Sequence, residues 1–217
     1  MADITIDGTA ISDVTIDGTP VQEVTIDGTT VWTRITIMED FEGGSNTFNG
    51  GSVVSSQSLE GTYSLTAPQY GSTAGTISGD HETVRGNTYK TYMSPRADES
   101  AWVLWDIQDN SSLSANFENC YFFVLEPRYN DIRLGKRVNG SSNTIAEDTA
   151  PGTIDGTDVW ELTIDHGSST ITVDVRNVTA DTYLSSVSGS DTEFNGGWIG
   201  AYGGSGSSAR FDYWRRV

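Results

Sequence analysis

Aromatic side chains that stand beside polar ones in loop-like stretches are the first candidates for chemistry in this sequence. Tyr70, Tyr129 and Tyr202 occur in such contexts, and Asp131 and Arg133 closely follow Tyr129. A sugar ring stacks on an exposed aromatic face while neighbouring polar groups bind its hydroxyls. These five residues are predicted as a glycan-binding set; the alternative for each is ordinary packing or a solvated strand edge.

A pair of carboxylates could instead hydrolyse a glycosidic bond. A retaining glycosidase needs two carboxyl groups about 5 Å apart, and alternate residues of a strand share one face. The nearest strings are residues 39–42 and 161–165; in the second, Glu161 and Asp165 share a face but are four residues apart. The sequence therefore predicts that the chain is not an enzyme.

The histidines and the cysteine carry weaker signals. His81 and His166 lie in turn-like segments without a nucleophile motif beside them, so both are expected to be exposed polar residues. Cys120 is the one cysteine, so it cannot form an intrachain disulfide. Because it lies in the apolar run 120–125, it is predicted to be a small buried hydrophobe.

The charge balance narrows the choice of partners. Twelve Lys and Arg against thirty Asp and Glu give a net charge of −18, which repels nucleic acid and anionic lipid. Dispersed acids, scarce Lys and many small polar residues are typical of proteins that work in high salt, where repulsion is screened. An ordinary acidic secreted protein is the alternative.

The sequence contains no membrane segment and no recognisable export signal. No stretch approaches the roughly 18 apolar residues that span a bilayer, so membrane insertion is not expected. Residues 1–3 lead directly into a repeat without a basic and apolar leader, so no signal peptide is predicted.

The elements that must position any site begin with a ten-residue repeat. Ile-Thr-Ile-Asp-Gly-Thr or Val-Thr-Ile-Asp-Gly-Thr starts at residues 4, 14 and 24, and Asp-Gly favours the two-residue turn of a β-hairpin. This register places three pairs of apolar residues opposite each other: Ile4 with Ile11, Val14 with Val21, and Val24 with Val31. The hairpins are predicted to continue as a meander with one apolar face, which a narrow ribbon cannot bury alone. It must dock on the following domain, on identical copies or on a larger assembly.

The remainder reads as short strands joined by turns. Alternation predicts that Trp160, Leu162 and Ile164 face inward, as do Ile171, Val173 and Val175. Segments 101–107 and 120–125 are apolar on both faces, which favours central strands covered on both sides. The natural outcome is two sheets packed face to face. The fourth Thr-Ile-Asp-Gly-Thr string, at 153–157, stands alone and is interpreted as one more Asp-Gly turn.

The motifs of this second part resemble those of concanavalin A-like and laminin-G-like lectin jelly rolls. The residues that carry the resemblance are the segments 40–44, 59–65, 121–124, 132–134, 159–176, 197–200 and 210–214. The resemblance implies a jelly roll, and a structural Ca²⁺ held by Asp40 or Glu42 and by Asp212, where the first strand meets the last. Surface acids are the alternative for these three residues. Glucanases of this fold carry Glu-x-Asp-x-x-Glu, which is absent from this sequence.

The leading repeats in turn resemble those at the start of virion proteins of tailed viruses, including viruses of haloarchaea. The resemblance implies a tail-fibre, baseplate or capsid-decoration subunit, made in the host cytoplasm and found in the virion. Its partners would be other copies and other virion proteins through residues 1–36, and host-surface glycan. The alternative is a carbohydrate-binding module of a secreted halophilic protein, located outside the cell.

Together these patterns predict an all-β chain of two parts. Residues 1–36 are expected to form a short β-hairpin meander for anchoring or oligomerisation. Residues 37–217 are expected to form a concanavalin A-like jelly-roll β-sandwich.

Overall fold

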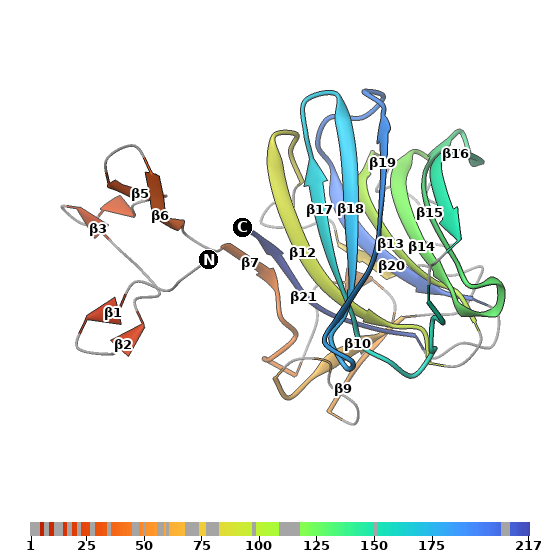
Figure 1. The fold of residues 1–217 in the computed structure, drawn as a ribbon, viewed down its shortest axis with the longest axis horizontal. Helices are drawn as coiled ribbons and strands as arrows, with labels where there is room; N and C mark the ends of the chain where they lie inside the picture. The colour runs from red at the N-terminus through yellow and green to blue at the C-terminus, as the bar shows by residue number, and fades with distance from the viewer. Residues whose placement is uncertain are drawn as a thin grey trace.

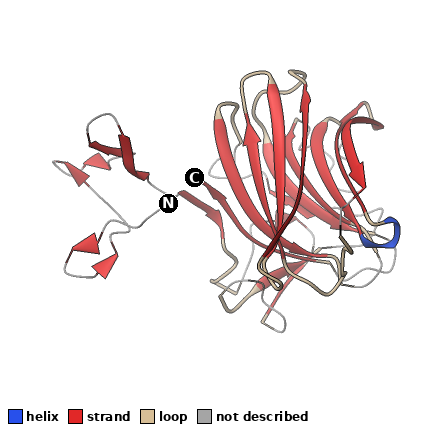
Figure 2. Ribbon diagram, viewed as in Figure 1, coloured by secondary structure: helices blue, strands red, loops and turns tan. Residues whose placement is uncertain are grey.

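The computed structural model describes residues 5–6, 9–10, 15–16, 19–20, 23–26, 29–33, 36–44, 48–49, 51–55, 59, 61–67, 74–76, 83–96, 99–108, 118–149, 152–204 and 209–217. The fold is all-β, as predicted, with two antiparallel sheets packed face to face as a jelly-roll-like sandwich (Figures 1 and 2). No helix in these ranges is long and apolar enough to cross a membrane.

An eight-stranded sheet forms the front layer in Figure 1. Its strands follow the order β19-β18-β17-β12-β21-β10-β9, and β7 also pairs with β21. Their bounds are β7 Thr36–Glu39, β9 Ser52–Val54, β10 Ser64–Thr66, β12 Asn87–Ser94, β17 Trp160–His166, β18 Thr170–Asn177, β19 Thr182–Ser190 and β21 Arg210–Arg216.

A seven-stranded sheet forms the back layer, in the order β16-β15-β14-β13-β20-β11-β8. The strands are β8 Phe48–Asn49, β11 Ala74–Thr76, β13 Ala101–Ile107, β14 Cys120–Glu126, β15 Asp131–Val138, β16 Ser141–Thr149 and β20 Trp198–Gly203. A 3-10 helix, η2 Pro127–Tyr129, joins β14 to β15.

The core lies between the layers and follows the predicted alternation. Trp160, Leu162 and Ile164 of β17 are buried inward, and so are the three predicted apolar residues of β18. The two apolar segments are central strands buried on both faces, as predicted: β13 and β14. Cys120 is fully buried, and burial raises its pKa to about 12. The structure thus confirms the small buried hydrophobe.

The expectation that His166 is an exposed polar residue is wrong. β17 continues through His166, so the alternation that buries Ile164 also turns this imidazole inward, where its exposure is 0%. Nε2 of His166 lies 3.5 Å from Oδ2 of Asp106, which is equally buried on β13 of the opposite sheet. The Tyr121 ring meets the imidazole edge-on at 5.6 Å. His81 lies outside the described residues.

Asp106 is positioned by a local irregularity of β13. The β13–β20 register shifts between Leu104 and Ile107, and Asp106 adopts a φ of 51° at this bulge. Thr83 holds it from the side, because its hydroxyl donates to Oδ1 over 2.6 Å and accepts from the Asp106 N–H over 3.1 Å. A Cβ on Gly197 would lie 2.6 Å from backbone atoms of this bulge. Only glycine permits so close an approach.

The N-terminal repeat forms three hairpins: β1 Thr5–Ile6 with β2 Thr9–Ala10, β3 Thr15–Ile16 with β4 Thr19–Pro20, and β5 Glu23–Ile26 with β6 Thr29–Thr33. Ile6 lies opposite Thr9, as the turn chemistry predicts. Within the described residues each hairpin is a separate two-stranded sheet rather than part of one meander, and all three stand apart from the sandwich (Figure 1).

One predicted pair in the repeat is wrong. Val24 lies opposite Trp32 rather than Val31, because the β5–β6 register shifts after Val24 and leaves an extra residue on β6. The pairs Ile4 with Ile11 and Val14 with Val21 lie outside the described residues. The isolated string at 153–157 is an Asp-Gly turn, as predicted, in which Asp155 Oδ1 accepts the Thr157 N–H over 2.8 Å.

Candidate functional site

The outer face of the seven-stranded sheet, which points away from the core, carries a second apolar cluster. Its buried members are Leu104, Ile107, Cys120, Phe122, Val124 and Tyr202, with Trp102 and Trp198 packed against them. Strand pairing continues the cluster into a row across five strands, in which Tyr202, Trp102 and Val124 are followed by the charged Arg133 and Glu147. The row brings residues far apart in the chain onto one surface.

Trp102 is the centre of this row. Its ring stacks on Tyr202 at 4.9 Å between centroids and 16° between planes, and lies 4.9 Å from Phe122. The Arg133 guanidinium lies 6.0 Å from the indole centroid, within the range of a cation–π contact. The indole N–H donates to Ser100 Oγ over 3.0 Å. These contacts hold a half-buried indole in one orientation beside the charged residues of β15.

Polar groups gather in the next row, where Glu126 lies opposite Asp131 and Asp131 opposite Thr149. Arg133 donates to Glu126 Oε2 over 3.1 Å. Burial raises the pKa of the Glu126 and Asp131 carboxyls, and Arg133 opposes this in both. The site therefore offers acceptor oxygens and a guanidinium in a partly dehydrated setting.

Tyr129 stands at the turn between these two strands. It is 67% exposed, and the Arg128 guanidinium lies 5.6 Å from its ring centroid. The turn is fixed by Asn130, which adopts a left-handed φ of 53°, donates its N–H to Pro127 and accepts the Ile154 N–H on its side-chain oxygen. We call Trp102, Glu126, Tyr129, Asp131 and Arg133 the β14–β15 site.

The predicted glycan-binding residues fall largely in this region. Asp131, Arg133 and Tyr202 share the outer face, and Tyr129 ends the 3-10 helix one residue before β15 begins; Tyr70 lies outside the described residues. Tyr202 is only 6% exposed and supports Trp102 rather than offering a free ring. Trp102 and Glu126 were missed. Alternation along β13 could have placed Trp102 outward, but its partners depend on the pairing of β13 with β20.

The interior offers no room for a sugar at the cavity found between the sheets. That cavity has a volume of about 20 Å³ and is lined mainly by core side chains of both sheets, among them Leu65, Val103, Phe211 and Trp214. It has the size of one water molecule. This cavity is therefore too small to hold a sugar ring.

The predicted calcium residues do not fit a metal in this arrangement. Asp40 Oδ1 accepts the Glu42 N–H, and Glu42 Oε1 accepts the N–H groups of Thr62 and Tyr63, which lower the Glu42 pKa. Asp212 is buried at the other end of the chain and accepts the Leu59 N–H over 3.3 Å. In the described part of the chain no three His, Cys, Asp or Glu side chains could hold one metal ion. Calcium therefore stays a prediction without a geometric site.

The remaining carboxylate pair lies on the outer face of the other sheet. Glu161 accepts hydrogen bonds from Lys90 and Tyr92 over 3.1 and 3.0 Å, and Arg215 lies 3.8 Å away. Asp165 is four residues further along β17, about 13 Å at the rise of a strand. That separation exceeds the carboxyl spacing of both retaining and inverting glycosidases.

Comparisons with known proteins identify solved structures with a similar fold, but they do not assign the chain to a family. No family model matches the chain, and no curated protein matches it. Among solved structures, it is similar to the carbohydrate binding module CBM66 from Bacillus subtilis, with a TM-score of 0.53, 14% identity and coverage of 77% of this chain and 90% of that one. It is also similar to a Bacillus subtilis protein of unknown function with a galectin-like fold. The TM-score is 0.57 at 11% identity, over 84% of this chain and 93% of that one.

A third similar structure is the exoplasmic/lumenal domain of VIP36 in its Ca²⁺/Man3GlcNAc-bound form. The TM-score is 0.55 at 9% identity, over 84% of this chain and 87% of that one. At such low identity the similarities establish a lectin-like β-sandwich fold and no more.

Proposed function

We propose that this chain binds carbohydrate at the β14–β15 site. The observation that carries the proposal is the exposed ring of Tyr129 at the turn that leads into β15, the strand on which Asp131 and Arg133 lie with Glu126 and Trp102 against Arg133. An exposed aromatic face, two carboxylates and a guanidinium on rigid strands form a typical sugar-binding set.

Each group has a distinct role in this proposal. The Tyr129 ring packs against the C–H face of a pyranose or furanose ring. The carboxylates of Asp131 and Glu126 accept hydrogen bonds from neighbouring hydroxyls, and Arg133, which has donors but no acceptor, donates to ring or hydroxyl oxygens. Trp102 holds Arg133 in place through its ring.

The similar structures support the proposal, but they do not assign carbohydrate binding to this chain. CBM66 is described as a carbohydrate binding module, and the VIP36 domain as bound to Man3GlcNAc. Both descriptions belong to those proteins. The hydrolytic alternative is weaker here, because the Glu161 and Asp165 carboxyls are too far apart along their strand.

A glycan array followed by calorimetry tests the proposal. Tyr129→Ala should weaken binding of any captured glycan about tenfold, the loss of roughly 1.4 kcal/mol of ring contact. With a monovalent glycan, whose affinity does not depend on any pairing of two chains, Tyr183→Ala is the matched control, since Tyr183 is 62% exposed but lies on β19 of the other sheet. Equal affinities for both variants, with unchanged folding, would overturn the assignment of the site.

We further propose that the N-terminal hairpins attach the sandwich to a larger assembly, as a virion subunit of a virus of a halophilic host would require. Three separate hairpins that stand apart from the sandwich favour this role (Figure 1). The net charge of −18 suits molar salt. Peptide mass spectrometry of purified virions should find the chain at a fixed ratio to the capsid protein. Recovery of the chain only from the virion-free culture medium would favour the secreted binding module.

A further inference from the structure

The two sheets end side by side in unusually long edge strands. β19 ends the eight-stranded sheet and β16 ends the seven-stranded sheet, each with nine residues. They contact closely: a Cβ on Gly189 would lie 2.4 Å from Ile145, and Ser185 donates to Asp148 over 2.5 Å.

The backbone of β19 is paired on one side. Its ladder runs with β18, and in the described ranges no other strand pairs with it. The register shift at its start leaves residues 185–190 as a regular segment. Native edges are commonly protected by Lys, by Pro or by inward-pointing charges, and β19 contains no Lys, Arg or Pro.

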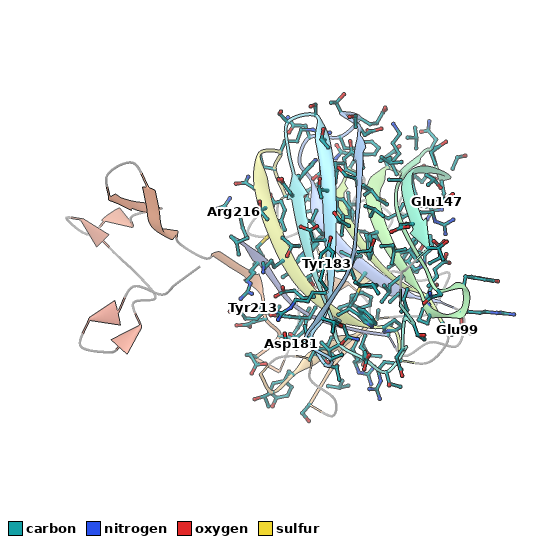
Figure 3. The ribbon with its side chains drawn as sticks, in the orientation of Figure 1. Glu99, Glu147, Asp181, Tyr183, Tyr213 and Arg216 are labelled. Atoms are coloured by element: carbon teal, nitrogen blue, oxygen red, sulfur yellow. The ribbon has the colours of Figure 1, made fainter. Side chains whose placement is uncertain are left out.

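The strand β19 itself carries no charged residue, on a strongly anionic molecule. Charged residues make up 19% of the chain, yet β19, residues 182–190, contains no Asp, Glu, Lys or Arg; the carboxylate nearest to it is Asp148 of the adjacent β16, which accepts the Ser185 hydroxyl. The acids that flank β19 already have cationic partners: Arg176 pairs with Asp181, and Lys136 pairs with Asp191 over 2.6 Å. Asp181 and Tyr183 are labelled near the start of the strand in Figure 3. β19 by itself is therefore a neutral strip about 30 Å long, at the rise of a nine-residue strand.

We propose that this strip is an interface for a second copy of the chain, with the two β19 strands paired antiparallel about a two-fold axis. An antiparallel strand edge is self-complementary, as such an interface requires. The absence of charge on β19 favours a second copy of this chain as the partner. A cationic protein would be attracted to the acidic surface elsewhere, whereas a partner with the same charge of −18 can approach closely only where charge is missing.

The geometry has a consequence for the outer faces. A two-fold axis perpendicular to the joined sheet places both seven-stranded sheets on the same side of it. The two β14–β15 sites would then face one surface together, which raises avidity for a multivalent glycan. This consequence depends on the proposed glycan binding, whereas the dimer does not.

Cysteine cross-linking of the full chain tests the interface. Ser186→Cys and Ser188→Cys, alone and mixed in equal amounts, should give disulfide-linked dimers on mild oxidation, because opposed residues across the axis meet the Cα separation of a disulfide. Thr172→Cys is the matched control: its hydroxyl lies 2.9 Å from that of Ser188 but one strand inward. The native Cys120 should not form a cross-link, because its side chain is buried. Cross-linking of the control as fast as of all the β19 variants would overturn the proposal.

Sedimentation at several salt concentrations gives an independent test. Salt screens repulsion between two anions, so dimers should strengthen at least several-fold from 0.1 M to molar NaCl. Ser186→Lys combined with Ser188→Lys should abolish them by bringing like charges together. A monomer at every salt concentration, or a dimer unaffected by the lysines, would overturn the interface. Failure of glycan binding with an intact β19 dimer would contradict only the proposed function.

Discussion

Two clusters in this molecule each set a carboxylate beside a basic group, one between the sheets and one on an outer face. In the first, Asp106 and His166 are 0% exposed and lie 3.5 Å apart across the core. In the second, Arg133 and Glu126 are 28% and 18% exposed, with a contact of 3.1 Å. The chemistry is similar, but the solvent access differs.

That difference decides what each cluster can do. In the described structure, Nδ1 and Nε2 of His166 and Oδ2 of Asp106 have no hydrogen-bond partner, so any change of protonation acts directly on folding. The Arg133 pair is only partly buried, so solvent screens it and it is weak by itself, and its groups remain available to a ligand. Because it is fully buried, the Asp106–His166 cluster can affect only stability. The Arg133–Glu126 cluster is partly exposed and can contact a ligand.

The largest expected effect comes from the buried carboxylate. Asp106→Ala should lower the free energy of unfolding by about 3 kcal/mol, because it removes the acceptor of the buried Thr83 hydroxyl and the carboxylate that faces buried His166. Urea denaturation measures this. Asp165→Ala, exposed on the same strand as His166, should change stability by no more than about 0.5 kcal/mol. If the two substitutions lowered the free energy of unfolding equally, the prediction that the buried Asp106 contributes more to stability than an exposed carboxylate would be contradicted.

The second prediction concerns pH. Burial lowers the pKa of His166 below 6.5, while Asp106 and Asp165 oppose and Arg85 reinforces the shift. The unfolded chain therefore takes up the proton first, so stability is full above about pH 6.5 and falls by up to about 1.4 kcal/mol per pH unit below it, down to the folded-state pKa. The difference between wild type and His166→Gln, measured by urea denaturation from pH 8 to 5, isolates this group. A difference independent of pH would contradict the assignment.

The exposed cluster should respond in the opposite sense. Arg133→Ala should weaken glycan binding about tenfold, roughly 1.4 kcal/mol, yet lower the free energy of unfolding by less than about 1 kcal/mol. Calorimetric titration and urea denaturation of the same preparation separate the two quantities. A large loss of stability with unchanged affinity would make Arg133 a structural residue and blur the contrast between the clusters.

The smallest effect is expected for the ion pair between Lys90 and Glu161 on the outer face of the other sheet. Its contact is 3.1 Å, with side-chain exposures of 28% and 12%. Lys90→Ala should cost about 0.5 kcal/mol in low salt and less in molar salt, since screening weakens partly exposed pairs. Thermal unfolding at the two salt concentrations measures this. A cost that grows with salt would show that the aliphatic stem of Lys90 matters more than its charge.

The sequence by itself determined the local features of this protein. Period-two alternation identified the inward residues of β17 and β18, and apolar runs identified β13 and β14 as central strands. The Asp-Gly dipeptides placed the hairpin turns, and the burial of Cys120 followed from its neighbours. Each of these depends on residues close in the chain, where side-chain direction alone sets the outcome.

Only the tertiary structure decided which side chains contact one another across strands and between the sheets. His166 continues the alternation of β17, but its partner Asp106 comes from the opposite sheet. Trp102 meets Tyr202 and Arg133 because β13 lies between β20 and β14, an order that no local pattern encodes. Strand order results from the packing of the whole chain. The proposed glycan residues could therefore be named from the sequence in part, while the surface that unites them could not.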